Sequence, residues 1–242
     1  MKIGKGDRVI IPSYVCTALL NAVMFTGATP VLSDVDPQSG NISAFHVKKV
    51  IRKNVRVVIA PHLFGNPLDI PEIEALGIPV IEDCAQCIGT SLNGKRIGGL
   101  STVSIYSFYA TKVLAAGEGG LVATSDKAIA ERLVELREYD NCNDYKPRFN
   151  FKMSDLHAAM AIQQFLKLKE MVSKRRAIAG DYLNNLSSPG PYIGFLPDDL
   201  TEKSIYYRFI IHLEAGVEKL IKLMKKRGIS CSRPVYKPLH HY

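Results

Sequence analysis

The run Ser107-Phe-Tyr-Ala-Thr-Lys-Val-Leu-Ala-Ala-Gly-Glu-Gly-Gly120 marks the place where an apolar segment ends and a glycine-rich turn begins. Lys112 lies at this junction. A lysine held at the end of a strand among apolar neighbours loses hydration, which favours its neutral, nucleophilic form. Because such an amine can form a Schiff base, Lys112 is a candidate catalytic residue. A lysine that simply points into water is the alternative for any single lysine.

A second run, Ile78-Pro-Val-Ile-Glu-Asp-Cys-Ala-Gln86, indicates a short buried strand that ends in two carboxylates. Ligands of open α/β sheets collect at the carboxyl ends of strands, so Asp83 is placed like a site residue. An aspartate there can hold the protonated ring nitrogen of pyridoxal phosphate (PLP), the ion pair that makes this cofactor an electron sink. Glu82 faces the opposite side, and we expect it to be solvated.

Short strand-like runs alternate with helix-like runs in the first half of the chain. This alternation predicts an α/β fold with a mainly parallel sheet flanked by helices. The glycines at 117, 119 and 120 allow the Lys112 loop to turn tightly. The runs are 8–12, 17–25, 29–35, 43–53, 55–60, 71–76, 79–81, 101–109 and 119–124, followed by a helix that Asp126 caps.

The stretch 140–147 is polar and turn-rich, which makes it the best candidate for a boundary or mobile loop. Beyond it, the pattern predicts a long helix from Ser154 to about residue 186, a strand over 206–213, a helix over 217–227 and a last strand over 229–236. We therefore expect a large domain over 1–145 and a helix with a smaller α+β part over 146–242.

The composition excludes several classes of protein. The chain has 242 residues, of which 47% are hydrophobic, enough for a globular core. No run of about 18 apolar residues appears, and the first residues lack the apolar stretch of a signal peptide, so a cytoplasmic location without a membrane partner is expected. Five irregularly spaced cysteines argue against a disulfide framework.

The net charge is +8, and basic residues cluster at 48–56, 173–176 and 222–227. We interpret these clusters as solvated helix faces. A nucleic-acid role is not expected, because aromatic residues are not interleaved with the basic ones. The pair in Cys84-Ala-Gln-Cys87 has the spacing of a redox or zinc motif, but no second pair accompanies it, so no metal is expected.

Taken in order, these segments resemble the DegT/DnrJ/StrS family of sugar aminotransferases, which are PLP enzymes of fold type I. The resemblance covers nearly the whole chain. It implies the large domain of that fold, in incomplete form. The segments that carry it are Gly6-Asp-Arg-Val-Ile-Ile-Pro-Ser13, Gly27-Ala-Thr-Pro-Val-Leu-Ser-Asp-Val-Asp36, Pro61-His-Leu-Phe-Gly-Asn-Pro67, Glu82-Asp-Cys-Ala-Gln86, Ser107-Phe-Tyr-Ala-Thr-Lys112, Gly117-Glu-Gly-Gly120, Phe149-Asn-Phe-Lys-Met-Ser-Asp155 and Arg233-Pro-Val-Tyr-Lys-Pro-Leu-His240.

The resemblance implies a role for each matching residue. Lys112 would hold PLP covalently, Asp83 would pair with the pyridine nitrogen, and Gln86 would meet the ring hydroxyl. Ser107 matches the phosphate-binding serine, and Asn150 matches an asparagine that reaches a phosphate in the neighbouring subunit's site. The active form would thus be a homodimer. Without the family, Ser107 is a strand hydroxyl bonded to backbone and Asn150 a turn residue before a capped helix.

Two departures from the family pattern stand out. Cys16 occupies the position where the family commonly places an aromatic ring on the cofactor. The family also has a segment before Gly6 with a loop that grips the phosphate, and relatives continue beyond Tyr242. On that comparison both ends of this chain look shortened, and phosphate binding would lose backbone donors.

The family reading predicts PLP-dependent transfer of an amino group from glutamate to a nucleotide-linked keto-sugar. The segment that carries Arg233, Lys237 and His240 resembles the substrate-side segment. Near the end of the chain, His240 could equally be a frayed terminal residue. Retention of Lys112 argues against the dehydratase branch, in which histidine replaces lysine. The alternative is a shortened, catalytically impaired relative that binds PLP or regulates.

Overall fold

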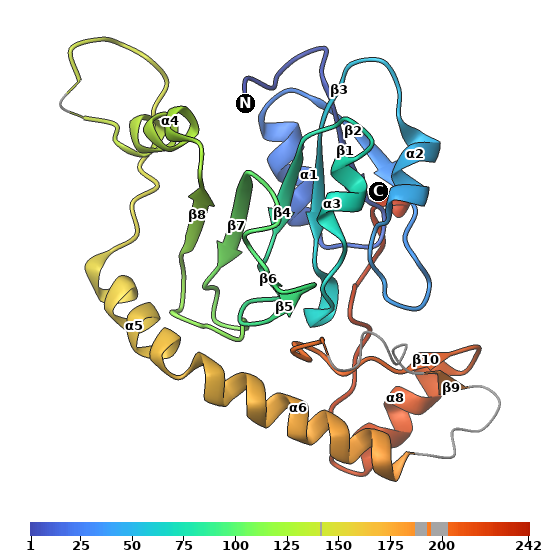
Figure 1. Cartoon of the computed structure of the whole chain (residues 1–242). Coiled ribbons are helices and arrows are strands. Elements are labelled where there is room, and N and C mark those ends of the chain that lie inside the picture. Colours follow the sequence, from blue (N-terminus) through green and yellow to red (C-terminus); the bar gives the residue numbers. More distant parts are fainter. Residues whose placement is uncertain (141, 187–192, 195–202) are drawn as a thin grey trace.

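The computed structural model describes residues 1–140, 142–186, 193–194 and 203–242. Its centre is a six-stranded sheet in the order β2-β1-β3-β4-β7-β8 (Figure 1). Neighbouring strands pair in parallel, except that β8 runs antiparallel to β7, so the predicted mainly parallel sheet is confirmed. The strands are β1 (Arg8–Pro12), β2 (Thr29–Ser33), β3 (Val55–Pro61), β4 (Val80–Asp83), β7 (Val103–Ser107) and β8 (Gly120–Thr124).

Helices and short elements complete the chain. They are α1 (Thr17–Phe25), α2 (Ala44–Val50), η1 (Leu63–Gly65), α3 (Ile70–Glu74), β5 (Ser91–Leu92), β6 (Lys95–Arg96), α4 (Lys127–Arg137), α5 (Asp155–Leu166), α6 (Leu168–Asn185), β9 (Ile193–Gly194), β10 (His212–Leu213), α8 (Val217–Lys226) and η2 (Leu239–His241). Among the described residues, no helix is long and apolar enough to cross a membrane.

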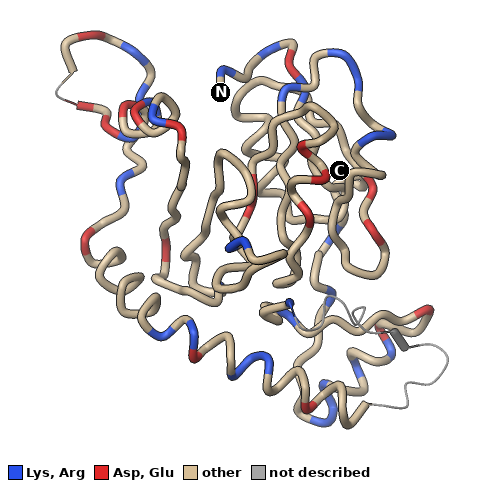
Figure 2. Tube along the Cα trace, viewed as in Figure 1, with Lys and Arg blue, Asp and Glu red and all other residues tan. Residues whose placement is uncertain are grey.

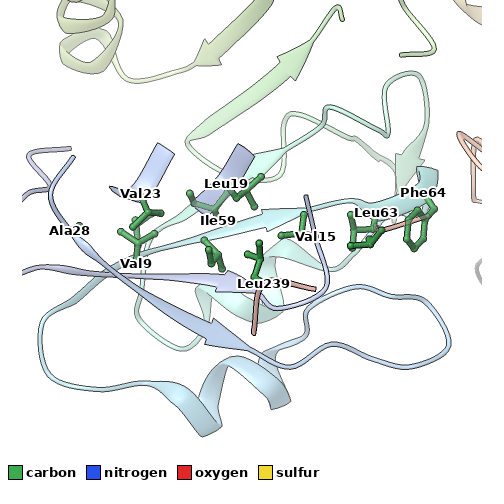
Figure 3. Packing of buried hydrophobic residues seen from close by; sticks show 12 residues of the cluster. Val9, Val15, Leu19, Val23, Ala28, Ile59, Leu63, Phe64 and Leu239 are labelled. Atoms are coloured by element: carbon green, nitrogen blue, oxygen red, sulfur yellow. The ribbon is translucent and has the colours of Figure 1, made fainter. Parts of the chain in front are cut away.

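Successive side chains of a strand point to opposite faces of the sheet, and each face has its own buried core. Val9 and Ile11 of β1 join the core on the α1 side, which also contains Leu239 from the end of the chain (Figure 3). Ile10, between them, joins a second core with residues of α2 and α3. Strands buried on both faces read as continuous apolar runs, which explains the sequence of β1.

Helix starts follow the predicted capping chemistry. The side chain of Asp126 accepts a hydrogen bond from Ile129 N at the start of α4, and Ser154 accepts one from His157 N at the start of α5. The single long helix expected after Ser154 is instead two helices. They meet at Lys167, which is both the C-cap of α5 and the N-cap of α6.

The strand predictions for the C-terminal part are largely wrong. Only His212–Leu213 of the stretch 206–213 is a strand, and residues 229–236, all described, form no strand. Arg208 N, within the first stretch, donates to Phe64 O, and the flanking residues Ile205 and Leu239 donate to Gly65 O and Ser13 O. The backbone next to these stretches is therefore bonded to the loops after β3 and β1.

The segment from β8 to α5 forms an outer arm, which we define as residues 120–140 and 142–166. In Figure 1 it stands apart from the β1–β4 half of the sheet. Each residue of α4 is at least partly exposed, and α5 buries Ala161. A hollow of about 1460 Å³ lies along β8, α4 and α5, and its lining includes Leu121, Phe149 and Phe165. Figure 2 shows charged residues spread along α4 and α6.

Candidate active site

The predicted site gathers where parallel strands end. β3, β4 and β7 run side by side, so the residues that follow each of them meet at one edge of the sheet. His62 follows β3 and donates its backbone N–H to Asp83 O at 3.1 Å. Asp83 ends β4, Ser107 ends β7, and Lys112 lies in the turn after it. Candidate site residues that follow or end three neighbouring strands thus lie at one edge of the sheet.

Asp83 is a desolvated carboxylate. Its exposed fraction is 5%, and within the described chain its side chain receives one hydrogen bond, from Ala85 N to Oδ1 at 2.9 Å. Burial raises the pKa of Asp83, while this hydrogen bond and the charge of Lys112 lower it in part. A cation placed against this carboxylate would stabilise its ionised form.

Lys112 is half-buried at the mouth of the site. Its backbone N–H donates to Tyr109 O at 2.9 Å, which closes a tight turn between β7 and the glycines. Its charge acts on Asp83, so the two predicted site residues interact across the site. Its Nζ atom lies 5.3 Å from the ring centre of Tyr207. Lys112 therefore lies near enough to Asp83 for its charge to lower the pKa of that carboxyl, and its catalytic role stays a prediction.

Gln86 is oriented by the chain itself. The backbone N–H of Phe64 donates to Gln86 Oε1 at 2.9 Å. Because that donor fixes which side-chain atom is the oxygen, the amide nitrogen of Gln86 is left to donate elsewhere. Phe64 has a φ of 60°, a left-handed conformation that is uncommon outside glycine and points its amide toward Gln86.

Ser107 and Cys16 both lie at element ends. Tyr109 N donates to Ser107 Oγ at 3.4 Å, so the hydroxyl of Ser107 retains its own proton for another acceptor. Cys16 is the N-cap residue of α1; its side chain makes no cap hydrogen bond and is exposed. A thiol at this position offers less stacking area than an aromatic ring.

Asn150 makes none of the hydrogen bonds described above between the candidate site residues. It is exposed in the loop that leads from α4 to α5, on the outer arm. Next to it, the rings of Phe149 and Phe151 stack with centres 4.8 Å apart, and Phe149 also contacts Phe25. An exposed asparagine on a projecting arm is accessible to a second molecule.

The residues expected on the substrate side lie in a segment that packs beside β1. Leu239 N donates to Ser13 O at 2.7 Å and anchors this segment at the carboxyl end of β1. Arg233 is exposed and pairs with Glu218 at 3.0 Å. Lys237 lies 4.4 Å from the ring centre of Tyr242, and His240 contacts His241. These side chains therefore have partners in the C-terminal part.

Glu82 is not solvated as the sequence suggested; its exposed fraction is 0%. Its carboxylate accepts hydrogen bonds from His62 Nε2 at 3.0 Å and from the backbone N–H groups of Gly98, Leu100 and Ser101. Burial alone would raise the pKa of Glu82, but these hydrogen bonds lower it below the usual value. Glu82 therefore fastens the loop after β6 to the base of the site.

His62 is the second residue that sequence reasoning missed. Its Nδ1 atom accepts from Leu68 N at 2.9 Å, so Nε2 carries the proton that it donates to Glu82. The signal was present: His62 and Glu82 each end an apolar run, and two such strands lie side by side. Pairing across strands is not visible in either segment by itself.

The donor atoms of His62, Glu82 and Cys84 lie within 4.8 Å of one another. Both ring nitrogens of His62 are already engaged within the protein. Burial raises the pKa of Cys84 and of Cys87, which keeps both thiols protonated. The sulfur of Cys87 lies 3.3 Å from Gly65 O. The arrangement fits small buried side chains in a packed core better than a metal centre.

Comparison with known proteins agrees with this geometry. Residues 1–242 match the DegT/DnrJ/EryC1/StrS aminotransferase family. The chain is 31% identical over 253 residues to GDP-perosamine synthase of Caulobacter vibrioides, covering 99% of this chain and 68% of that protein. It is 35% identical over 194 residues to a UDP-N-acetyl-3-dehydro-alpha-D-glucosamine 3-aminotransferase of Acidithiobacillus ferrooxidans, covering 77% and 53%. The chain belongs to the DegT/DnrJ/EryC1/StrS aminotransferase family.

Solved structures match as well. DesV of S. venezuelae, determined in complex with a ketimine intermediate, has a TM-score of 0.91 at 32% identity, covering 99% of this chain and 66% of that one. The aminotransferase TlmJ from Streptoalloteichus hindustanus has a TM-score of 0.90 at 30% identity, covering 98% and 68%. These matches confirm the expected fold type I architecture. The chain spans about two thirds of the length of these proteins.

Proposed function

We propose that this protein is a PLP-dependent aminotransferase that moves an amino group from glutamate to a nucleotide-linked keto-sugar. Family membership supports this, as do relatives named GDP-perosamine synthase and UDP-sugar 3-aminotransferase. The observation that carries the proposal is geometric: Lys112 lies in the turn after β7, and the buried carboxylate of Asp83 ends the neighbouring parallel strand β4.

The residues at this edge fit PLP. Asp83 is a buried carboxylate with few hydrogen bonds of its own, and a protonated ring nitrogen would supply the missing partner. The amide nitrogen of Gln86 is free to meet the ring hydroxyl, and the hydroxyl of Ser107 can donate to the phosphate. Cys16 would lie against the ring. When bound, PLP supplies the electron sink that acidifies the Cα–H bond of an amino acid.

The protein's own task is to place groups and move a proton. Lys112 Nζ would first bind the cofactor covalently and then, once released by the amino donor, accept the proton that leaves Cα of glutamate. The same amine would return that proton in the half-reaction that delivers nitrogen to the sugar. Burial raises the pKa of Asp83, so a charged ring nitrogen beside it would favour the ionised carboxylate, and cofactor protonation would be coupled to binding.

The substrate-side segment would take the sugar nucleotide. Arg233 is close enough to Tyr14 that its charge lowers the pKa of Tyr14, although burial raises that pKa more. Arg233, Lys237 and His240 therefore place positive or ionisable groups beside the carboxyl end of β1. Guanidinium and ammonium groups suit the diphosphate of a nucleotide-linked sugar. The segment would thus bind the second substrate next to Cys16.

A homodimer would complete the site. Asn150 is exposed on the outer arm, far along the chain from the Lys112 turn, and would reach the phosphate group in the partner's site. Large apolar side chains on α5 are also exposed, among them Leu156, Ile162 and Phe165, at 72%, 59% and 60%. Ile162 and Phe165, three residues apart on one face of α5, both line the hollow along the arm, and apolar surface of this kind marks an interaction site. The enzyme would act in the cytoplasm on small molecules.

The test is to load the chain with PLP, reduce with borohydride and map the modified peptide. We expect the modification on Lys112 and its loss in Lys112→Met, while Lys48→Met, which removes an exposed lysine, keeps it. Formation of 2-oxoglutarate from glutamate with GDP-, UDP- and TDP-linked keto-sugars then measures transfer. We expect Lys112→Met to lower this rate by about 10³-fold or more, since proton transfer and covalent catalysis both need the amine.

Two results would change the conclusion. Modification of another lysine would contradict the site. Modification of Lys112 without transfer to any keto-sugar would favour a PLP-binding relative without turnover. Because the two readouts are independent, cofactor binding and catalysis are judged separately.

A further inference from the structure

Tyr207 lies beside the reactive amine although the two are far apart in sequence. The Nζ atom of Lys112 is 5.3 Å from the centre of the Tyr207 ring. The Tyr207 hydroxyl is 3.5 Å from Thr111 Oγ1, across a sequence separation of 96 residues. One aromatic side chain therefore contacts both residues at the tip of the turn that carries Lys112.

The backbone that carries Tyr207 is fastened on both sides. On the sheet side, Ile205 N donates to Gly65 O at 3.0 Å and Arg208 N donates to Phe64 O at 3.2 Å. On the helix side, Arg175 of α6 donates to the carbonyl oxygens of Tyr206 and Tyr207. The stretch 173–176 was expected to be a solvated helix face, but its residue Arg175 holds the Tyr206–Tyr207 backbone through these hydrogen bonds. Tyr207 is thus held in place.

Gly65 makes this docking possible. A Cβ atom on Gly65 would lie 2.7 Å from Tyr207 N and 2.9 Å from the side chain of Ile205. Its φ of +93° also favours glycine over other residues. The close approach brings the 204–208 segment against the same loop, 64–65, that orients Gln86. Tyr207 therefore belongs to the wall of the site.

Two positively charged side chains lie near the ring of Tyr207. The guanidinium carbon of Arg208 lies 5.5 Å from the ring centre, and Lys112 Nζ lies 5.3 Å from it. Burial alone would raise the pKa of Tyr207, but the hydrogen bond with Thr111 and the charges of Lys112 and Arg208 lower it below the usual value. An aromatic face within about 6 Å of an ammonium attracts it.

We propose that Tyr207 is a positioning residue for Lys112: its ring and hydroxyl hold the lysine amine inside the site whenever that amine is not bonded to the cofactor. The proposal rests on the proposed function, in which Lys112 is released in each cycle and must stay near the reacting carbon. A free lysine side chain has many rotamers, and a partner that limits them keeps the amine in reach.

The first experiment uses the cofactor-free chain. Tyrosine ionisation is followed by ultraviolet absorbance, and the difference between wild type and Tyr207→Phe isolates the Tyr207 phenol. The same difference is then measured in a Lys112→Met background. We expect the pKa of Tyr207 to rise by about 0.5 to 2 there, the effect of losing a unit charge about 6 Å away at an effective dielectric of about 20 to 80. An unchanged pKa would overturn the proposal.

Lys49→Met is the matched control, because Lys49 lies 3.8 Å from the ring centre of Phe45 on the surface. This variant removes an equal charge from an aromatic contact elsewhere and should leave the Tyr207 difference unchanged. A rise equal to that of Lys112→Met would reflect overall charge and would count against a specific contact.

The second experiment uses the loaded enzyme. Tyr207→Leu removes ring and hydroxyl, whereas Tyr207→Phe keeps the ring. We expect Tyr207→Leu to lower kcat by about 10- to 100-fold, with KM for glutamate within about twofold, and Tyr207→Phe to recover part of the loss. Equal losses accompanied by a lower melting temperature would indicate a merely structural residue. A wild type without transfer would refute the proposed function, while the titration still decides the Tyr207–Lys112 contact.

Discussion

The two sides of the central sheet are built differently. At β4, Glu82 and Asp83 are buried, and Glu82 has four hydrogen-bond donors within its own chain. At β8 and along α5, apolar side chains such as Leu121 and Phe165 are 47% and 60% exposed. The buried polar groups of β4 are therefore bonded within the single chain, whereas the outer arm carries exposed apolar side chains. The comparison separates a part of the molecule that is stabilised internally from a part that we propose for self-association.

The largest effect should come from breaking the buried pair of His62 and Glu82. Glu82→Ala leaves three backbone N–H groups and a buried imidazole without their acceptor, so the free energy of unfolding should fall by about 3 to 5 kcal/mol. Urea denaturation measures this. The control, Glu170→Ala, breaks an exposed pair with Lys174 and should leave stability unchanged within error. Similar losses in both variants would mean that the β4 side is not the more tightly built.

Substitution of Asp83 should raise the free energy of unfolding, whereas substitution of Glu82 lowers it. Its pKa is raised in the folded chain, so its favourable contribution is present below the unfolded pKa and is lost as pH rises through the folded pKa. Asp83→Asn should therefore raise the free energy of unfolding of the cofactor-free chain at pH 7 by about 1 to 3 kcal/mol, and much less at pH 3. Denaturation at the two pH values measures this.

The sign for Glu82 is reversed. The pKa of Glu82 is lowered, so its contribution to stability is present above the unfolded pKa and is lost as pH falls through the folded pKa.

For Asp83, the prediction would be contradicted by an Asp83→Asn variant that is less stable than wild type at pH 7. That result would mean that the buried carboxylate does not destabilise the cofactor-free chain. PLP binding should be lost in the Asp83→Asn variant. The role of Asp83 in binding is thereby separated from its effect on the free energy of unfolding.

The smallest effect on the folded chain should come from the outer arm. Phe165→Glu changes a side chain that is 60% exposed, so thermal stability should change little. Self-association, measured by sedimentation velocity, should weaken by at least about tenfold, or about 1.4 kcal/mol, because a charge replaces apolar surface. Gln163→Glu, also at an exposed position of α5, should keep the association. Equal effects of both variants would place the interface elsewhere.

Much of the first half could be predicted from the sequence. Apolar runs of strand length located β1, β3 and β4, and Asp126 and Ser154 marked helix starts, because these signals are local. The rule that ligands collect at the carboxyl ends of strands singled out Asp83, which ends β4 in the structure. The placement of Glu82 in solvent was wrong, since its partners come from His62 and from the loop after β6.

The domain division at residue 145 stays a prediction, as do the roles of all the candidate site residues, Lys112 and Asp83 included. The strand expected at 229–236 and most of that expected at 206–213 did not form. Within these stretches the structure buries Tyr206 and Val235, whereas Ile211, Ile229 and Tyr236 are exposed. Arg208 N donates to Phe64 O in the loop after β3 instead of to a neighbouring strand, and that distant partner is not visible in the local pattern.

The sequence by itself determined the chemistry on offer, an amine, a strand-end carboxylate and a flexible glycine turn, because each depends on neighbouring residues along the chain. The tertiary structure decided which groups meet: the Glu82–His62 pair, Arg175 with the Tyr206–Tyr207 backbone, and Tyr207 beside Lys112. These contacts join distant segments. Their free energy depends on packing and desolvation in three dimensions, which no local pattern contains.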